Sequence, residues 1–488
     1  MFEELLFETG TQIKLEIFRS LSKRAPGQYT YQEISEATQL TYSQLTKGLL
    51  EIEEELTQAN YLTQPLIRPN IGVVTTEMTI STDQYLEFLL KESLPYHFFL
   101  ATLLEPELGL ENFCKRHFIS RSTLSRKMRK MTIFLKEYGI QISYHDFALT
   151  GREDKIRLFY YYFIYLCHHN LSWPFTISQV EAALQVEKFA KFFPQNGRYV
   201  SRLMLTIFGG VCITRIQQHK LMPADARVDF IFEANPHYDL NKLNNEYGLK
   251  KYQSQAEARF IYFICNFFPF YEMPEDPAIA ASLKTFQTVA NPVGKFGDRI
   301  VCFVAETLQL DLSRELTNLL RANLYNSLLA FYIFSGPFPN LISFLIPKGN
   351  HKLIENEFQN DIYLFLLKLT NEPEFQVFQK SALPLAKMIR ESLLPLILRS
   401  NTHTRLRVAI ASEPNYLLTF NLLNFLKELS FVDVAYFQEG KSYDLIISTL
   451  ATLPTDKPIY YWQHEFGTRN LNNLYQRLLQ QFMQKNGI

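Results

Sequence analysis

The segment GLENFCKRHFISRSTLSRKMRKMTIFLKEYGIQISYHDFALTGRED, residues 109–154, carries most of the information about the fold. Its first part holds two stretches with the apolar spacing of helices, separated by a turn near Phe118–Ser120. Its last part alternates between apolar and polar residues around Tyr144–Asp146, which is typical of a β-hairpin. Two helices, a short turn and a following hairpin predict a winged helix-turn-helix domain.

The second helix of this segment gathers positive charge. Residues 115–136 contain eight basic side chains and no acidic ones, although the whole chain has 49 Lys and Arg against 49 Asp and Glu. On a helix over 122–135, one apolar stripe recurs at i, i+4, i+7 and i+11 and should pack inward. The stripe is Leu124, Met128, Met131 and Leu135. Ser120 or Ser122 can cap the start of the helix.

The polar face of this helix suits the major groove of DNA. Arginine can bind a guanine edge through two hydrogen bonds, while lysine, serine and threonine hold phosphates. The predicted DNA-binding residues are Ser120, Arg121, Ser122, Thr123, Ser125, Arg126, Lys127, Arg129 and Lys130, with His145 and Arg152 on the hairpin. The alternative interpretation is a solvated basic helix face.

A similar layout precedes this one in residues 1–80. Thr30 and Glu33 have the spacing of a capping box, and two helical halves join near 39–41 before a β-rich stretch. The second of these helices carries four glutamates within 51–55, so its acidic end should face away from DNA. Secondary DNA contacts are predicted at its start, at Thr41, Tyr42, Ser43, Gln44 and Lys47. A packing or dimer-contact module is the alternative.

At 488 residues the chain is too long for one core, and its patterning predicts a mainly α, multidomain protein. We expect winged helix-turn-helix domains at 1–80 and 81–164, the second being the main DNA reader. Helical bundles should follow at 165–290 and 291–402. In 403–488 strands alternate with helices, which predicts a small α/β domain with a largely parallel sheet.

This organisation resembles the Mga/AtxA-type virulence regulators of Gram-positive bacteria across essentially the whole chain. The most specific piece is 118–157, which closes with G-R-E-D-x-I-R at 151–157. The resemblance implies that the bundles are PTS-regulation domains and that the tail is similar to enzyme IIB of sugar phosphotransferase systems. It further implies a DNA-binding transcription regulator that forms homodimers, with phosphotransferase-system proteins as further partners.

The sequence departs from the phosphorylation pattern of such regulation domains, which place a histidine seven residues before an arginine. Phe208 stands seven residues before Arg215, and the other pattern positions hold Ile264 or Cys265 and Asn323 or Leu324. The remaining bundle histidines are candidates for phosphorylation, although a single histidine is more often structural. They are His168, His169, His219, His237 and His351.

The tail also departs from an active enzyme IIB, which carries a cysteine nucleophile after its first strand. Residues 411–415 read Ala-Ser-Glu-Pro-Asn, where the glutamate would repel phosphate and the proline removes an N–H donor. We therefore expect docking or dimerisation here rather than phosphotransfer, with help from the aromatic residues of the tail. These are Phe431, Tyr436, Phe437, Tyr460, Tyr461 and Trp462, which in the alternative interpretation only fill the core of the tail.

Nothing in the sequence predicts an enzyme, a cofactor or a metal site. The five cysteines form no C-x-x-C pair, and no run reaches 18 apolar residues. The acidic start MFEELLFETG is unlike a signal peptide, so we expect a cytoplasmic protein that binds double-stranded DNA and no membrane. The alternatives are a phosphotransferase-system signalling protein and an RNA-binding antiterminator.

Overall fold

The computed structural model describes residues 2–76, 78–169, 171–190, 199–232, 238–243, 247–268, 271–288, 290–308, 313–345, 357–399, 404–412, 416–450, 453–462 and 468–486. The chain forms two compact units. The first comprises Met1–Pro269 and Pro337–Asn350, and the second comprises Phe270–Gly336 and His351–Ile488. The prediction of a mainly helical chain with a small sheet in its C-terminal region is confirmed.

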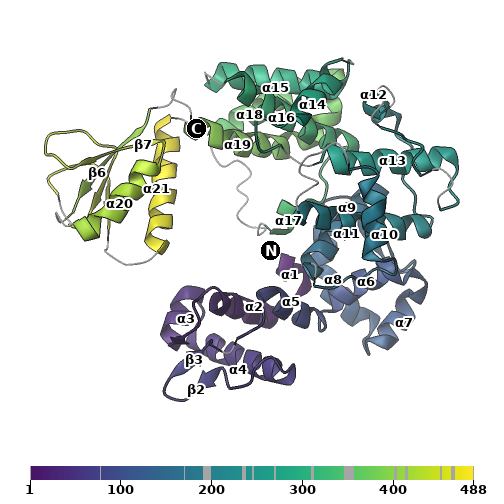
Figure 1. Cartoon of the computed structure of the whole chain (residues 1–488), viewed down its shortest axis with the longest axis horizontal. Coiled ribbons are helices and arrows are strands. Elements are labelled where there is room, and N and C mark those ends of the chain that lie inside the picture. The colour runs from purple at the N-terminus through teal and green to yellow at the C-terminus, as the bar shows by residue number, and fades with distance from the viewer. Residues whose placement is uncertain are drawn as a thin grey trace. The chain divides into compact units, whose positions relative to one another are not determined.

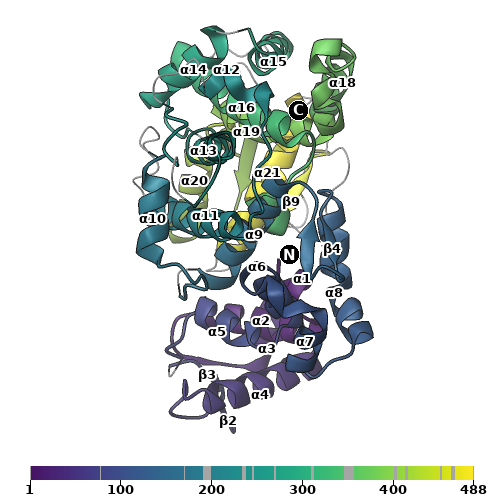
Figure 2. The ribbon, with the colours of Figure 1, turned by 90° about the vertical axis from the view of Figure 1, so that its right-hand side faces the viewer.

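The first unit begins with four helices and a small sheet. The helices are α1 (Phe2–Leu6), α2 (Thr9–Ser22), α3 (Tyr31–Thr38) and α4 (Tyr42–Gln58). The strands β1 (Gln28–Tyr29), β2 (Ile67–Arg68) and β3 (Gly72–Val74) pair antiparallel in the order β1-β3-β2. The hairpin β2–β3 lies beside α4 (Figure 1, Figure 2). The predicted capping box between Thr30 and Glu33 is present at the start of α3.

A second helical layout with a hairpin follows. It consists of α5 (Thr82–Leu90), α6 (Leu94–Leu104), the short 3-10 helix η1 (Pro106–Leu108), α7 (Gly109–Arg116), α8 (Arg121–Lys136), strands β4 (Gln141–Ser143) and β5 (Ala148–Thr150), and α9 (Glu153–His168). Residues 91–93 separate α5 from α6. Pro95 lies in the first turn of α6, where its missing N–H costs no helical hydrogen bond.

The two layouts pack against each other inside the first unit. The ring of Phe18 on α2 stacks on Tyr85 of α5 with 4.3 Å between centroids. The Tyr85 hydroxyl donates a 2.6 Å hydrogen bond to Glu55 of α4, which also pairs with Lys14. Glu53 accepts a 2.6 Å bond from the backbone N–H of Ile67 in β2. Glu53 and Glu55 therefore have tertiary partners, whereas Glu54 is exposed.

The rest of the first unit is helical. It contains α10 (Gln179–Glu187), α11 (Tyr199–Gln217), the 3-10 helix η3 (Ala226–Val228), α12 (Asp229–Phe232) and α13 (Lys251–Asn266). Helix α11 contacts α6, α9 and α10. A Cβ atom on Gly209 would lie only 2.8 Å from the carbonyl oxygen of Ala182, so this glycine permits the close approach of α11 to α10.

A segment from much later in the chain completes this unit. Helix α17 (Leu341–Leu345) places the buried ring of Phe344 against aromatic rings of three other helices. Its nearest ring is Phe134 of α8, at 4.8 Å between centroids, followed by Phe2 of α1 at 5.8 Å. Phe159 and Tyr162 of α9 both lie at 6.2 Å. Phe344 therefore supports the inner side of α8.

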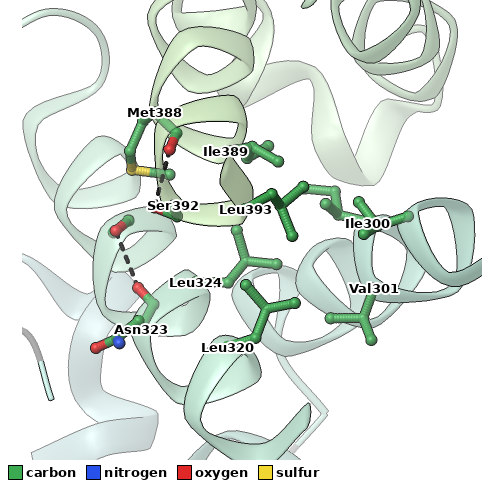
Figure 3. Close-up of a pocket in the computed structure, with 11 residues that line it drawn as sticks. Ile300, Val301, Leu320, Asn323, Leu324, Met388, Ile389, Ser392 and Leu393 are labelled. Atoms are coloured by element: carbon green, nitrogen blue, oxygen red, sulfur yellow. Dashed lines mark hydrogen bonds between the residues drawn. The ribbon is translucent and has the colours of Figure 1, made fainter. Parts of the chain in front are cut away.

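The second unit contains a helical bundle. Its helices are α14 (Ala278–Thr288), α15 (Pro292–Leu308), α16 (Arg314–Phe334), α18 (Glu357–Leu369), the 3-10 helix η4 (Pro373–Ser381) and α19 (Ala382–Arg399). Residues of α15, α16 and α19, among them Leu320, Leu324 and Leu393, enclose a small apolar cavity (Figure 3). Its volume of about 20 Å³ has room for roughly one water, which fits a packing void better than a ligand site.

The tail of the second unit is a parallel sheet, as predicted. Strands β6 (Leu406–Ala411), β7 (Val432–Tyr436), β8 (Leu445–Ser448) and β9 (Ile459–Tyr461) pair in the order β7-β6-β8-β9. Helices α20 (Tyr416–Glu428) and α21 (Thr468–Asn486) pack on it (Figure 1). Phe431 and Trp462 are buried, whereas Tyr436 and Tyr461 on the edge strands are more than half exposed. Of the loop 411–415, residues 413–415 lie outside the described residues.

Candidate nucleic-acid interface

Helix α8 has the local structure that its sequence predicts. It starts at Arg121, and the Ser120 hydroxyl accepts a 3.1 Å hydrogen bond from the backbone N–H of Thr123, so Ser120 is the cap. All four residues of the predicted apolar stripe are fully buried. The polar face of α8 is consequently the side left for a partner.

The turn before α8 falls where the sequence places it. Helix α7 ends at Arg116, and Phe118 adopts a left-handed backbone with φ of 52°. This residue is 96% exposed, which is unusual for a phenylalanine. This aromatic ring lies two residues before the cap of α8, and charge counting gave no reason to select it.

Three cations of α8 are available to a partner. Arg126, Arg129 and Lys130 are exposed and, among the residues that the structure describes, none of them forms an ion pair. They stand at i, i+3 and i+4, which puts them on one face of the helix. Ser122 and Ser125 are exposed, while Thr123 is half-buried. This face combines positive charge with hydroxyl groups, the chemistry that binds phosphates and base edges.

Other basic residues of the predicted site have intramolecular partners. Arg121 pairs with Glu111 at 2.7 Å, and Lys127 pairs with Glu8, which lies between α1 and α2. Hydrogen bonding and the charge of Lys127, with smaller effects of Arg126 and Lys130, lower the pKa of Glu8. An acidic side chain far away in sequence thus lies close to the basic helix.

The hairpin β4–β5 is attached to α8 and to the core. Its register pairs Gln141 with Thr150 (Figure 2 shows β4 beside α8). Burial raises the pKa of Tyr144, and hydrogen bonds with Ser125 and Thr132 of α8 offset part of that effect. At the tip, the side chain of His145 is 97% exposed and its Nδ1 lies 2.8 Å from Asp146.

The predicted secondary contacts lie at the start of α4. Thr41 caps this helix in a capping box with Gln44, so both side chains hydrogen-bond within the turn. Ser43 and Tyr42 are exposed, and the Tyr42 ring lies 5.6 Å from that of Tyr31. Lys47 is largely exposed, and its Nζ atom lies 3.9 Å from a carboxylate oxygen of Glu51.

Comparison with known families now adds to this geometry. The family model described as the Mga helix-turn-helix domain matches residues 78–164, from just before α5 to within α9. The match is consistent with the Mga-type regulator family. It indicates a DNA-binding regulator, since DNA binding is the role of that domain. A comparison with curated proteins gives no match. Among the described residues, no helix is long and apolar enough to cross a membrane.

The motif G-R-E-D-x-I-R at 151–157 lies near the end of residues 78–164, which we call the Mga-like segment. This motif has a structural role that the sequence pattern did not reveal. Arg157 is fully buried and donates to both oxygens of Glu257 on α13, at 2.6 and 2.9 Å. Glu153 accepts from Arg157 at 3.1 Å and from Arg215 of α11 at 2.7 and 2.9 Å. The sequence offered one signal for this role. Arg157 is a charged residue beside the apolar run of α9, and a buried charge requires a partner.

Arg152, predicted to contact DNA, has a partner in the same motif. Its guanidinium donates to the buried carboxylate of Asp154 at 2.5 and 3.2 Å. Arg215 is almost fully buried and bound to Glu153, so it ties α11 to the start of α9. The motif therefore joins the Mga-like segment to the helices that follow it.

The candidate histidines have different environments. His168 is buried, with Nδ1 2.7 Å from the Ser172 hydroxyl and Nε2 3.5 Å from the Tyr96 hydroxyl. The Nδ1 atom of His169 lies 3.0 Å from Asp83. His219 is exposed and has a left-handed backbone at the end of α11. His237 and His351 lie outside the described residues.

Proposed function

We propose that this protein is a transcription regulator that binds promoter DNA through α8 and the hairpin β4–β5. What supports the proposal is the row of cations Arg126, Arg129 and Lys130, which form no ion pair with the described residues, on a capped helix whose opposite side is buried. This helix lies within the segment that matches the Mga helix-turn-helix domain. In this role the two arginines contact base edges and the lysine contacts a phosphate.

The hairpin extends the contact along the DNA backbone. His145 at its tip is nearly fully exposed, and Tyr144 connects the turn to Ser125 of α8. The start of α4, with Tyr42 and Lys47, supplies secondary contacts. Winged helix-turn-helix domains combine a helix in the major groove with such flanking backbone contacts.

The remaining regions carry the regulatory part of the proposal. The helices of 165–290 and 291–402 regulate DNA binding, and the α/β tail 403–488 takes part in dimerisation. The edge strand β7 supports the latter, because Tyr436 on this strand is 56% exposed and edge strands present unpaired backbone groups. In this role the regulator acts as a dimeric activator.

The experiment that tests DNA binding uses duplexes that the full-length protein recovers from a random-sequence pool. Fluorescence anisotropy of these duplexes should show that Arg126→Ala/Arg129→Ala weakens binding by about 2–6 kcal/mol in total, at ~1–3 for each arginine. If about six phosphates are contacted, log K should fall with log salt at a slope of about −5.

A matched control removes two exposed arginines elsewhere. Arg202→Ala/Arg299→Ala deletes the same charge at positions paired with Glu187 and Glu372 and should leave affinity nearly unchanged. If the Arg126/Arg129 variant binds the selected duplexes as tightly as the parent protein, α8 is not the reading helix. If a hairpin RNA outcompetes the duplexes, the protein is an RNA-binding regulator instead.

Dimerisation is tested separately by light scattering on the full chain. Tyr436→Lys should lower the average mass at micromolar concentration, because a charge at the edge of β7 opposes pairing with a second copy. The control Lys441→Ala, at another exposed residue of the tail, should leave the average mass unchanged. An unchanged mass for Tyr436→Lys would move the dimer contact away from β7.

A further inference from the structure

The turn between α7 and α8 carries a phenylalanine at a position where glycine is the usual residue. The N–H of Phe118 donates a 3.2 Å hydrogen bond to the carbonyl of Lys115, and the N–H of Ile119 donates a 3.0 Å bond to the carbonyl of Cys114. These two bonds and the φ of 52° at Phe118 form a Schellman motif, whose left-handed position usually holds glycine. A residue with a Cβ atom is disfavoured in this conformation, so Phe118 costs stability there.

The ring of Phe118 gains little from the fold to offset that cost. The residue is 96% exposed, the highest value among the large hydrophobic residues that the structure describes. Within the same part of the chain, its ring forms no aromatic pair and no cation–π pair. The backbone around it is fixed on both sides, because the Schellman bonds end α7 and Ser120 caps α8. A strained, exposed residue on a fixed backbone indicates a function outside the fold.

The chain around Phe118 is polar and positively charged. From Lys115 to Ser122, every other exposed side chain is polar or basic, and none is acidic. The acidic residue nearest in sequence, Glu111, is paired with Arg121 at 2.7 Å. An apolar ring with a basic rim suits a polyanion that also displays apolar groups. The major groove of DNA has this chemistry, because the C5-methyl group of thymine lies there between two rows of phosphates.

We propose that Phe118 contacts the C5-methyl group of a thymine in the major groove and thereby selects an A·T pair at one position of the binding site. The inference rests on the proposed function, because it requires that α8 lies in the major groove. The first residues of a recognition helix contact base edges, and Phe118 lies two residues before the cap of α8. Apolar contact with the thymine methyl group is a known form of base readout by phenylalanine.

Single replacements of thymine by deoxyuracil test this contact. Each replacement, made in a duplex that the full-length protein recovers from the random pool, removes one methyl group and keeps the base pair. With the parent protein, at least one replacement should weaken binding about fourfold, the effect of one buried methyl-sized group. Phe118→Gly should bind this modified duplex and the unmodified one equally. Phe118→Tyr keeps the ring and should retain the fourfold difference, which fluorescence anisotropy measures as a double-mutant cycle between ring and methyl group.

The glycine variant also separates a DNA contact from a structural role. Glycine relieves the left-handed strain, so Phe118→Gly should melt at or above the temperature of the parent protein. A clear fall in melting temperature would assign the ring to the fold and overturn the inference. The matched control Tyr252→Ala removes a ring that is 58% exposed at the start of α13, and it should leave the fourfold difference unchanged.

The outcomes distinguish this inference from the proposed function. If no thymine position responds, or if Phe118→Gly keeps the parental response at every position, Phe118 does not contact a thymine methyl group, and a protein partner becomes the better occupant of this surface. When Arg126→Ala/Arg129→Ala still weakens binding in that case, only this inference fails. If the arginine variant binds like the parent protein, the reading helix itself is wrongly assigned.

Discussion

Replacing Arg157 with methionine should destabilise the first unit strongly. Arg157 is fully buried and donates to Glu257, Glu153 and the carbonyl of Lys220. Without it, the buried carboxylate of Glu257 keeps only the N–H of Met222 as a described donor. Breaking a buried pair by removing one partner costs about 3–5 kcal/mol, because the remaining charge stays desolvated. Such a loss is a large fraction of the ~5–15 kcal/mol that stabilises a typical domain.

The two tryptophans of the chain make this measurement specific. Trp173 lies in the first unit and Trp462 in the second, so a Trp462→Phe background leaves a fluorescence signal from the first unit alone. In urea, Arg157→Met should lower the unfolding free energy reported by Trp173 by about 3–5 kcal/mol. The control Arg202→Met breaks an exposed pair and should cost less than about 1 kcal/mol.

The double variant Arg157→Met/Glu257→Leu provides the decisive comparison. Replacing both members of a buried pair by apolar residues is often neutral or stabilising, so the double variant should recover most of the loss. The coupling of the two changes then measures the penalty of the unpaired charge. If Arg157→Met costs less than about 1 kcal/mol, or if the double variant is less stable than the single one, the buried network does not hold this unit together.

Three further predictions concern other contacts of the first unit. Phe344→Ala should lower its unfolding free energy by about 3–5 kcal/mol, because it leaves a cavity against Phe134; a loss below about 1 kcal/mol would mean that the ring is not packed there. Burial lowers the pKa of His168 from 6.5 to about 4, so the fold favours the neutral ring and stability is present above pH 6.5 and lost toward pH 4. That shift corresponds to about 3 kcal/mol of unfolding free energy. Urea titrations between pH 6.5 and 4 should therefore show a smaller loss of unfolding free energy in His168→Gln than in the parent protein. Equal losses in the two proteins would contradict the burial of His168. Glu8→Gln should release Lys127 and raise DNA affinity by up to about fivefold at low salt, since an exposed pair is worth ~0–1 kcal/mol; anisotropy with unchanged or weaker binding would contradict this.

Local features of the chain could be predicted from the sequence because local spacing encodes them. The stripe of α8, its cap Ser120 and the turn at Phe118 depend on residues within a few positions of one another. The parallel tail follows from strands that alternate with helices. Each of these patterns has a period or a fixed offset that identifies it.

The partners of the charged residues could not be predicted in the same way. Lys127 and Glu8 are 119 positions apart, and Arg157 and Glu257 are 100 apart. No spacing rule connects such residues, because tertiary packing alone brings them together. The packing of Phe344 against α8 has the same origin, since an apolar residue in a short segment carries no mark of the helix it contacts. Charge counting alone therefore does not show which cations of the site already have intramolecular partners.

The intramolecular partners also rank the predicted DNA contacts by the energy that each side chain must give up before it can meet DNA. Arg126 and Arg129 form no ion pair with any described residue, so they need break none there to meet DNA. Arg121 must leave Glu111, but both side chains are about two-thirds exposed, so the exchange costs only ~0–1 kcal/mol and a phosphate can compensate for it. Arg152 differs, because its partner Asp154 is buried and would keep only the N–H of Lys155 as a described donor. Leaving a buried charge without its partner costs several kcal/mol, more than one surface phosphate contact returns. In the proposed function, Arg152 therefore maintains the base of the hairpin, and the α8 face is the part that reads the DNA.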